Sequence, residues 1–331
     1  MNLLITGGAG FIGANFAHYA VRHGHNVLVY DLLTYAGNPK NISSLKHFVQ
    51  GDIRDADKLE SIFKNGIDGK PFDAVINFAA ESHVDRSISL AMPFVETNVV
   101  GAVTLLEVAR KHTVPTFIQI STDEVYGSIE GTGKFTRSSP LHPSSAYSAS
   151  KAAADLLLLS YHHTHGMDVR ITRCTNNYGR CQHPEKLIPT IISNALAGKP
   201  IPIFGDGKQV RDWIFVEDHC AGILAALERG KSGAIYHFGG PGMEMNEVGI
   251  SNMDLVHLVL RILANELGKD ISQFTSLIRN VADRPGHDRR YALDWSESIT
   301  ELGWQPKTSL EDGLDKTIRW WLDNQDWWNG V

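Results

Sequence analysis

The chain has 331 residues, of which 43% are hydrophobic and 21% charged, and its formal net charge is −6. This composition is that of an ordinary folded protein and argues against a disordered chain. The negative charge argues against nucleic acid as a partner, because neutralising phosphates requires clustered lysine and arginine.

Short apolar runs alternate with helix-length segments over the first half of the chain. The expected strands cover residues 3–6, 26–30, 74–78, 116–121 and 168–174, and the expected crossover helices cover residues 11–22, 55–63, 93–111 and 144–163. This βαβ alternation predicts an α/β fold built on a Rossmann-type doubly wound parallel sheet.

Beyond residue 178 the alternation loosens into stretches punctuated by proline and glycine. We expect residues 1–178 to form the Rossmann domain, and residues from about 212 to 239 to return to it. Residues 179–211 and 240–331 should form a smaller, mixed α/β lobe for the substrate. Four C-terminal tryptophans should pack in a core or subunit contact rather than stack on a ligand: Trp320, Trp321, Trp327 and Trp328.

A glycine-rich run directly follows the first expected strand. Gly7, Gly10 and Gly13 allow a diphosphate to approach the backbone at the start of a helix, where Phe11 and Ile12 lie. Asp31 ends the second strand, where a carboxylate accepts hydrogen bonds from ribose hydroxyls and repels a 2′-phosphate. The pattern therefore predicts NAD rather than NADP as the cofactor.

Further cofactor contacts are expected after the next two strands. Asp52 and Ile53 close the third strand pattern and are placed at the adenine edge, although an N-cap region before Asp55 is an equal interpretation of these two residues. Ala79 and Ala80 are small enough for a dinucleotide to lie close to the backbone.

Tyr147 and Lys151 are four residues apart on an expected helix, so their side chains share one face. A nearby ammonium and a positively charged nicotinamide can lower the pKa of a phenol, which can then take a proton from a hydroxyl group. The strand before them should deliver Ser121 or Thr122 beside the pair.

Together these motifs resemble the extended short-chain dehydrogenase/reductase superfamily over essentially the whole chain. Within it, residues 121–127, Ser-Thr-Asp-Glu-Val-Tyr-Gly, resemble the nucleotide-sugar 4,6-dehydratases. The resemblance implies that NAD oxidises C4 of a hexose, that water leaves across C5 and C6, and that hydride returns to C6. It also implies that Thr122 polarises the C4 oxygen beside Tyr147, that Asp123 is the acid and that Glu124 is the base.

Residues 80–87, 173–179 and 184–189 are similar to the dTDP-glucose 4,6-dehydratases in particular. This similarity implies a nucleotide-sugar substrate that is bound by Ser82, His83, Thr122, Asn176, Glu185, Lys186, Leu187, Pro202, Phe204, Arg211, Asn246, Arg284 and His287. Asn252 is the alternative to Asn246. The family pattern after Gly179 is replaced by Arg180 and Cys181, which changes the edge of the pocket.

Other functions stay open at this point. UDP- or CDP-glucose could replace dTDP-glucose as the substrate, and a nucleotide-sugar 4-epimerase and a non-catalytic NAD-binding redox sensor are further alternatives.

The resemblance implies a homodimer joined by helices near residues 93–111 and 144–163. The three cysteines have no metal-ligand spacing and fit a reducing compartment, so we expect no metal. Residues 1–6 are apolar but stop at a glycine cluster, which leaves no room for a signal-peptide core or a membrane span, so we expect a cytoplasmic location and no membrane partner.

Overall fold

The structure is a computed structural model that describes residues 1–129, 131–241, 249–283 and 287–328. Its centre is a seven-stranded sheet in the order β11-β6-β5-β4-β1-β2-β3, and all its strand pairs are parallel. The strands are β1 (Asn2–Thr6), β2 (Asn26–Asp31), β3 (His47–Gln50), β4 (Ala74–Asn77), β5 (Thr116–Thr122), β6 (Val169–Cys174) and β11 (Ile235–Phe238). This confirms the α/β fold predicted from the sequence, with the reversal of strand order beside β1 that creates a ligand crevice.

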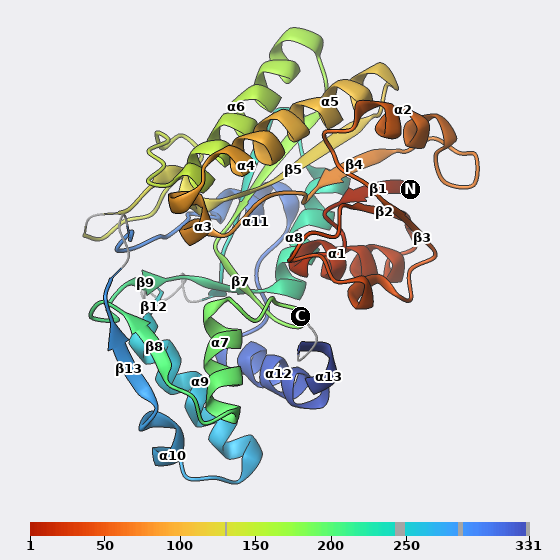
Figure 1. Cartoon of the computed structure of the whole chain (residues 1–331). Helices are drawn as coiled ribbons and strands as arrows, with labels where there is room; N and C mark the ends of the chain where they lie inside the picture. Colours follow the sequence, from red (N-terminus) through yellow and green to blue (C-terminus); the bar gives the residue numbers. More distant parts are fainter. Residues whose placement is uncertain (130, 242–248, 284–286, 329–331) are drawn as a thin grey trace.

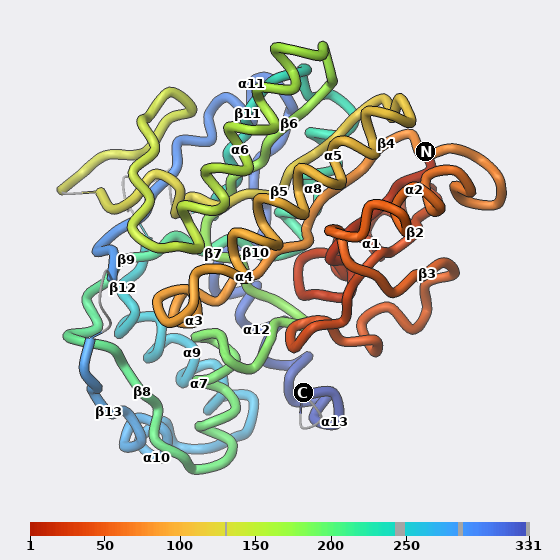
Figure 2. The backbone as a smooth tube through the Cα atoms, turned by 45° about the horizontal axis from the view of Figure 1, so that its top comes forward, coloured from red at the N-terminus to blue at the C-terminus, as the bar shows by residue number. Residues whose placement is uncertain are grey.

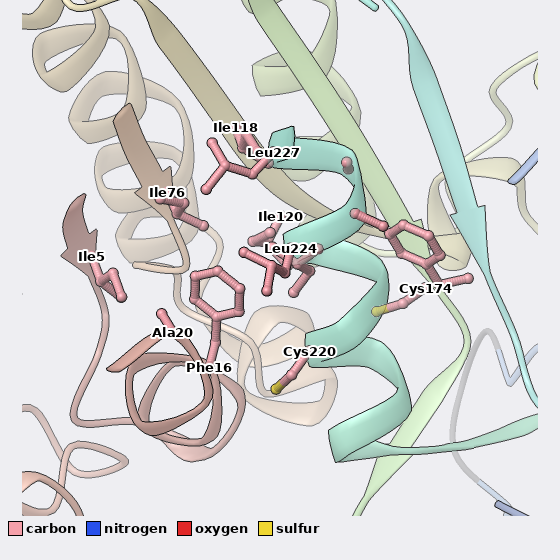
Figure 3. Close-up of a cluster of buried hydrophobic side chains, with 14 of the residues drawn as sticks. Ile5, Phe16, Ala20, Ile76, Ile118, Ile120, Cys174, Cys220, Leu224 and Leu227 are labelled. Atoms are coloured by element: carbon pink, nitrogen blue, oxygen red, sulfur yellow. The ribbon is translucent and has the colours of Figure 1, made fainter. Parts of the chain in front are cut away.

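Helices cover both faces of this sheet because consecutive side chains of a buried strand point to opposite sides. Leu3 and Ile5 of β1 join one core, whereas Leu4 joins the core on the other face. The first core is covered by α1 (Phe11–Arg22), α8 (Val216–Arg229) and α11 (Ser296–Leu302). Figure 3 shows part of this core, in which Phe16 of α1 and Leu224 of α8 lie among side chains of the sheet that include Ile76 and Ile120.

The opposite face carries α2 (Ala56–Asn65), α6 (Ala146–His165) and a long helical stretch over residues 92–111 (Figure 1). That stretch consists of α4 (Met92–Phe94), the π-helical η2 (Val95–Gly101) and α5 (Ala102–Lys111). By length and composition alone, Met92–Lys111 could cross a membrane. Its packing against α2 and α6 accounts for the apolar side chains on its inner face.

The smaller lobe has its own core around α7 (Leu187–Leu196), α9 (Asn252–Leu267) and α12 (Leu310–Asp323). Three two-stranded sheets surround it: β7 (Asn176–Tyr178) with β10 (Trp213–Phe215), β9 (Val210–Arg211) with β12 (Ile250–Ser251), and β8 (Ile201–Phe204) with β13 (Ile278–Val281). Trp321 is fully buried in this core, and the other three C-terminal tryptophans pack against it, so the predicted packing is confirmed.

The remaining elements are short: η1 (Pro39–Ile42), α3 (Val84–Ser89), η3 (Asp123–Tyr126), α10 (Ser272–Thr275) and α13 (Gln325–Trp328). The chain crosses between the two parts more than once, since β11 joins the main sheet while β10 pairs with β7. The domain boundaries at residues 178, 212 and 239 stay a proposal.

One local expectation was wrong: β3 ends at Gln50, so Asp52 and Ile53 lie in the turn beyond it and not at the end of a strand.

Candidate functional site

A cavity of about 560 Å³ opens at the carboxyl ends of β1, β2, β4, β5 and β6. Every residue predicted for the cofactor lines this cavity: Gly7, Gly10, Phe11, Ile12, Gly13, Asp31, Asp52, Ile53, Ala79, Ala80, Tyr147 and Lys151. So do the predicted catalytic residues Thr122, Asp123 and Glu124, and the predicted substrate residues Ser82, Asn176, Glu185 and Lys186. Tertiary structure thus brings three sequence motifs into one site.

The glycine loop between β1 and α1 is packed so closely that side chains do not fit. A Cβ atom on Gly7, whose φ is +66°, would lie 2.5 Å from the Ala79 nitrogen, and one on Gly13 would lie 2.3 Å from the Gly7 oxygen. Gly10 is the N-cap residue of α1 and makes no side-chain cap bond. The N–H groups of the first helical turn therefore face the cavity, which fits the diphosphate of a dinucleotide.

Asp31 lies at the end of β2, with its carboxylate fixed by the backbone. Its Oδ2 accepts from Ala9 N at 2.9 Å, and its Oδ1 accepts from Leu33 N at 2.7 Å. Burial raises the pKa of Asp31, and these two backbone donors oppose that rise. The geometry presents the remaining lone pairs to the cavity, where ribose hydroxyl groups of NAD would donate.

The predicted adenine end contains a charged side chain that sequence reasoning missed. Asp52 is held by its neighbour Arg54, whose Nη2 lies 2.6 Å from Asp52 Oδ2. Arg54 also lines the cavity and forms an ion pair with Glu96 at 2.9 Å. The N-cap of α2 is Asp55, which accepts from Lys58 N at 3.0 Å, so Asp52 and Ile53 do not serve as that cap.

Tyr147 and Lys151 lie in the first two turns of α6, where a capping box of Ser145 and Ser148 fixes the start of the helix. Lys151 Nζ donates to Ile120 O at 2.6 Å, and burial lowers the pKa of Lys151 to about 8. Asp155, one turn further along, opposes this shift. The buried ammonium is thus fixed against the end of β5.

The protein alone does not lower the pKa of Tyr147. Burial raises it well above 10, and the negative charge of Glu124 adds to the rise, while hydrogen bonding to Thr122 opposes it. The expected lowering therefore depends on positive charge that arrives with the cofactor. Of the two hydroxyl candidates, Thr122 is the partner of Tyr147, since Ser121 Oγ donates to Asp155 Oδ2 at 2.9 Å.

The two carboxyl groups of η3 differ in environment. Asp123 is only 3% exposed, and burial followed by the nearby Glu124 charge raises its pKa well above the usual value. Its Oδ1 accepts from Thr122 Oγ1 at 3.2 Å, whereas its Oδ2 is buried without a hydrogen-bond partner among the described residues. Such an environment favours a protonated Asp123 beside a more accessible Glu124.

A smaller cavity of about 50 Å³ adjoins the first, because Glu124 and Asn176 line both. Arg211 and His287, both predicted for the substrate, lie there together with Tyr291. The Arg211 guanidinium lies 4.3 Å from the centre of the Tyr291 ring, and Nη2 donates to Asp288 O at 2.7 Å. The cavity therefore places fixed positive charge next to the predicted base.

Glu185 is surrounded by donors from both parts of the molecule. Its carboxylate lies 3.4 Å from His83 Nε2 and 3.5 Å from Arg86 Nη2, and it accepts from Tyr35 OH at 3.3 Å. Arg86 in turn stacks on the Tyr35 ring, with its Cζ 3.6 Å from the ring centre. His83 thus reaches the site through Glu185, and Tyr35 and Arg86 are members of this cluster that sequence reasoning missed.

The other predicted substrate residues are placed differently. Leu187 begins α7, and Pro202 and Phe204 lie on β8, and these three line neither cavity. Asn246 and Arg284 lie outside the described residues, so their roles stay predictions. The unusual Arg180 lines neither cavity and donates from Nε to Asn15 Oδ1 of α1 at 2.7 Å.

Asn98 is a positioning residue that no motif revealed. It is 1% exposed in the π-helical η2, and its side chain bonds both the N–H and the C=O of Glu81 and donates to Ser150 Oγ at 2.9 Å. Ser150 Oγ donates to Tyr147 O at 2.7 Å. Asn98 thereby links the loop after β4 to the first turn of α6, and only the fold brings these segments together.

Comparison with known proteins agrees with this geometry. The family model described as GDP-mannose 4,6 dehydratase matches residues 4–317. A dTDP-glucose 4,6-dehydratase of Xanthomonas campestris is 47% identical, and the alignment covers 99% of this chain and 95% of the relative. A similar solved structure is that of DesIV, a dTDP-glucose 4,6-dehydratase of Streptomyces venezuelae with NAD and TYD bound. Its sequence is 47% identical to this chain, and its TM-score is 0.90. The match covers 100% of this chain and 99% of DesIV.

A third relative is a dTDP-glucose 4,6-dehydratase of Bacillus anthracis in complex with NAD, with 41% identity, a TM-score of 0.88 and coverage of 100% and 99% of the two chains. Fold and site together define an NAD-binding, Rossmann-type enzyme of nucleotide-sugar metabolism. The chain belongs to the dTDP-glucose 4,6-dehydratase family.

Proposed function

We propose that the side chains around Tyr147 carry out NAD-dependent 4,6-dehydration of dTDP-glucose, which yields dTDP-4-keto-6-deoxy-D-glucose and water. The reaction is that of the family, and it makes the protein a hydro-lyase. When bound, NAD accepts a hydride from C4 and returns it to C6. The proton transfers belong to the chain's own residues.

The observation that carries this proposal is the carboxyl pair of η3 facing the Tyr147–Lys151 face of α6 across one cavity. An oxidoreductase that only oxidises an alcohol needs the tyrosine and lysine but no second acid and base. A dehydratase needs both, because one group must remove the C5 proton while another protonates the C6 hydroxyl as it leaves.

We assign the steps accordingly. Tyr147 takes the proton of the C4 hydroxyl, Thr122 polarises that oxygen, and the Lys151 ammonium favours the deprotonated form of Tyr147. Glu124 takes the proton from C5, and the electron pair of that C–H bond forms the C5–C6 double bond. Glu124 gives this proton back to C5 when the hydride returns to C6. Asp123, whose pKa burial raises well above the usual value, donates its proton to the C6 oxygen, which leaves as water.

The residues of the smaller cavity support a substrate with a diphosphate. Arg211 offers a planar set of N–H donors, and Asn176 lies between this cavity and the predicted catalytic groups. We therefore propose that Asn176, Arg211 and His287 hold the part of the nucleotide sugar next to the hexose, with Ser82 and Lys186 on the wall of the larger cavity.

The reaction is tested by incubating the purified protein with dTDP-, UDP- and CDP-glucose and measuring the products by mass spectrometry. The expected result is loss of one water from dTDP-glucose, without added reductant. Loss from UDP- or CDP-glucose instead would change the assigned nucleotide. Retention of mass with a change at C4 would identify an epimerase and contradict the proposal.

We also propose that the protein is a homodimer joined through the helical layer over the sheet. Apolar side chains of this layer are exposed on the single chain: Ile88, Leu90, Met92, Val95, Val100, Leu156 and Leu157. Patches of this kind usually mark an interaction surface.

Leu156 is 58% exposed on α6, so Leu156→Glu should lower the mass measured by light scattering to that of one chain. Ile271→Glu alters an exposed apolar residue of the smaller lobe and is the matched control. A wild-type protein that already has the mass of one chain would contradict the dimer.

A further inference from the structure

The C-terminal tryptophan cluster lies outside both cavities, yet one member contacts the Rossmann domain. Trp327 packs edge-on against Trp320, with ring centres 5.1 Å apart, and its neighbour Trp328 tilts against Trp321. The short α13 that carries Trp327 lies beside the segment following β2, as Figure 2 shows for the dark blue and red parts of the chain. Lys40 Nζ of that segment also donates to Asp326 O at 2.9 Å.

A chain of hydrogen bonds runs from this helix to the glycine loop. Trp327 Nε1 donates to Asn41 Oδ1 at 2.7 Å, and Asn41 Nδ2 donates to Ala9 O at 2.9 Å. Ala9 lies between Gly7 and Gly10, and its own N–H donates to Asp31 Oδ2 at 2.9 Å. The two peptide groups that flank the Ala9 Cα are therefore both held, one by the predicted ribose carboxylate and the other by Asn41.

The chemistry of Asn41 makes this arrangement directional. An indole N–H can only donate and a backbone carbonyl can only accept, so the asparagine amide must turn its oxygen to Trp327 and its nitrogen to Ala9. Asn41 is 7% exposed, and a group that loses a partner at such a site has little water to replace it. The indole thus fixes the orientation of the amide, and the amide holds the carbonyl of Ala9 together with Asn38 N, which donates to the same oxygen at 3.0 Å.

We propose that Trp327 is a positioning residue for the cofactor. Acting through Asn41, it holds Ala9 and the loop of Gly7 to Gly13 in the shape that receives the dinucleotide diphosphate, so the C-terminal end of the described chain controls NAD affinity. The proposal rests on NAD binding in this loop. It adds a dependence on the smaller lobe that the glycine motif by itself does not contain.

The test compares three single variants stripped of cofactor. Trp327→Phe keeps an aromatic ring but removes the donor to Asn41. Asn41→Asp keeps the acceptor for Trp327 but turns an oxygen toward the Ala9 carbonyl. Trp328→Phe is the matched control, because its indole N–H donates at 3.2 Å to Trp321 O within the smaller lobe.

Calorimetry with NAD should give a Kd about five-fold higher for Trp327→Phe, which is the loss expected for one hydrogen bond. Asn41→Asp should raise the Kd at least as much, and Trp328→Phe should leave it within two-fold of wild type. The kcat at saturating NAD should stay unchanged in all three. The double variant Asn41→Asp, Trp327→Phe should bind NAD no more weakly than Asn41→Asp.

An unchanged Kd for Trp327→Phe overturns the proposal, as does an equal loss in Trp328→Phe or full additivity in the double variant. A further outcome is that Trp327→Phe and Trp328→Phe lose NAD binding equally and only in proportion to a lower Tm. This outcome shows that the tryptophans have a general role in packing, and it also overturns the proposal. Failure of the wild-type protein to bind NAD would instead contradict the cofactor assignment itself.

Discussion

The two halves of the cleft are built in different ways. The cofactor half consists mainly of backbone from contiguous motifs, with the glycine loop against Ala79 and Asp31 held by two peptide N–H groups. The substrate half consists of side chains from distant segments that bond to one another, as Tyr35, Arg86 and Glu185 do. The cofactor half can therefore be predicted from the sequence, whereas the substrate half depends on contacts between segments that are distant in the sequence.

The largest effect is expected where the two halves join. Tyr147→Phe removes the group that we propose takes the C4 hydroxyl proton, so kcat should fall about 1,000-fold with NAD affinity little changed. Single-turnover kinetics of NAD reduction measure this. Tyr161→Phe is the control, since Tyr161 lies on the same helix and bonds Glu107 away from the cavity. Unimpaired NAD reduction in Tyr147→Phe would remove Tyr147 as the base.

A smaller but more diagnostic effect is expected at the carboxyl pair. Asp123→Asn with Glu124→Gln should slow elimination about 100-fold while leaving C4 oxidation largely intact, because the pair acts after the ketone has formed. Reduced cofactor should then accumulate on the enzyme and be visible by its absorbance. Loss of the initial oxidation in this variant would contradict the division of roles between η3 and α6.

The pH dependence of C4 oxidation should depend on the ionisation of Lys151, which is buried beside Tyr147. Lys151, whose pKa burial lowers to about 8, carries its charge below that pH and loses it as the pH rises. C4 oxidation should therefore fall by up to about ten-fold per pH unit above 8, as a single ionisation requires. Stopped-flow rates across this range measure the slope. The same limb in Lys151→Met would exclude Lys151 as its source.

The smallest effect is expected from the cluster that bridges the halves. Glu185→Gln removes the charge that His83 and Arg86 surround, so the KM for the nucleotide sugar should rise about five-fold while kcat changes little. Glu266→Gln, which alters an ion pair with Arg319 in the smaller lobe, is the control. A larger effect on kcat than on KM would place Glu185 in the chemistry and weaken the comparison.

The extent of sequence-based prediction follows the same division. The glycine loop, Asp31 and the Tyr147–Lys151 pair could be predicted because each is a local motif at the end of a strand or the start of a helix. Asn98 and Arg86 could not, since their partners Ser150 and Glu185 lie 52 and 99 residues away, and no spacing in the sequence encodes such contacts. For the substrate residues, the resemblance to a family supplied what local physics did not.

The sequence by itself determined the parallel sheet, the preference for NAD over NADP and the chemistry of a paired acid and base. The first two follow from hydrophobic periodicity and from residue types at fixed short spacings, and the third follows from the resemblance to a family. The tertiary structure decided which hydroxyl group, Thr122 rather than Ser121, meets Tyr147, and which carboxyl group, Asp123, is buried deeply enough for its pKa to rise well above the usual value. Burial and long-range hydrogen bonds decide such questions, and both exist only once distant segments have packed together.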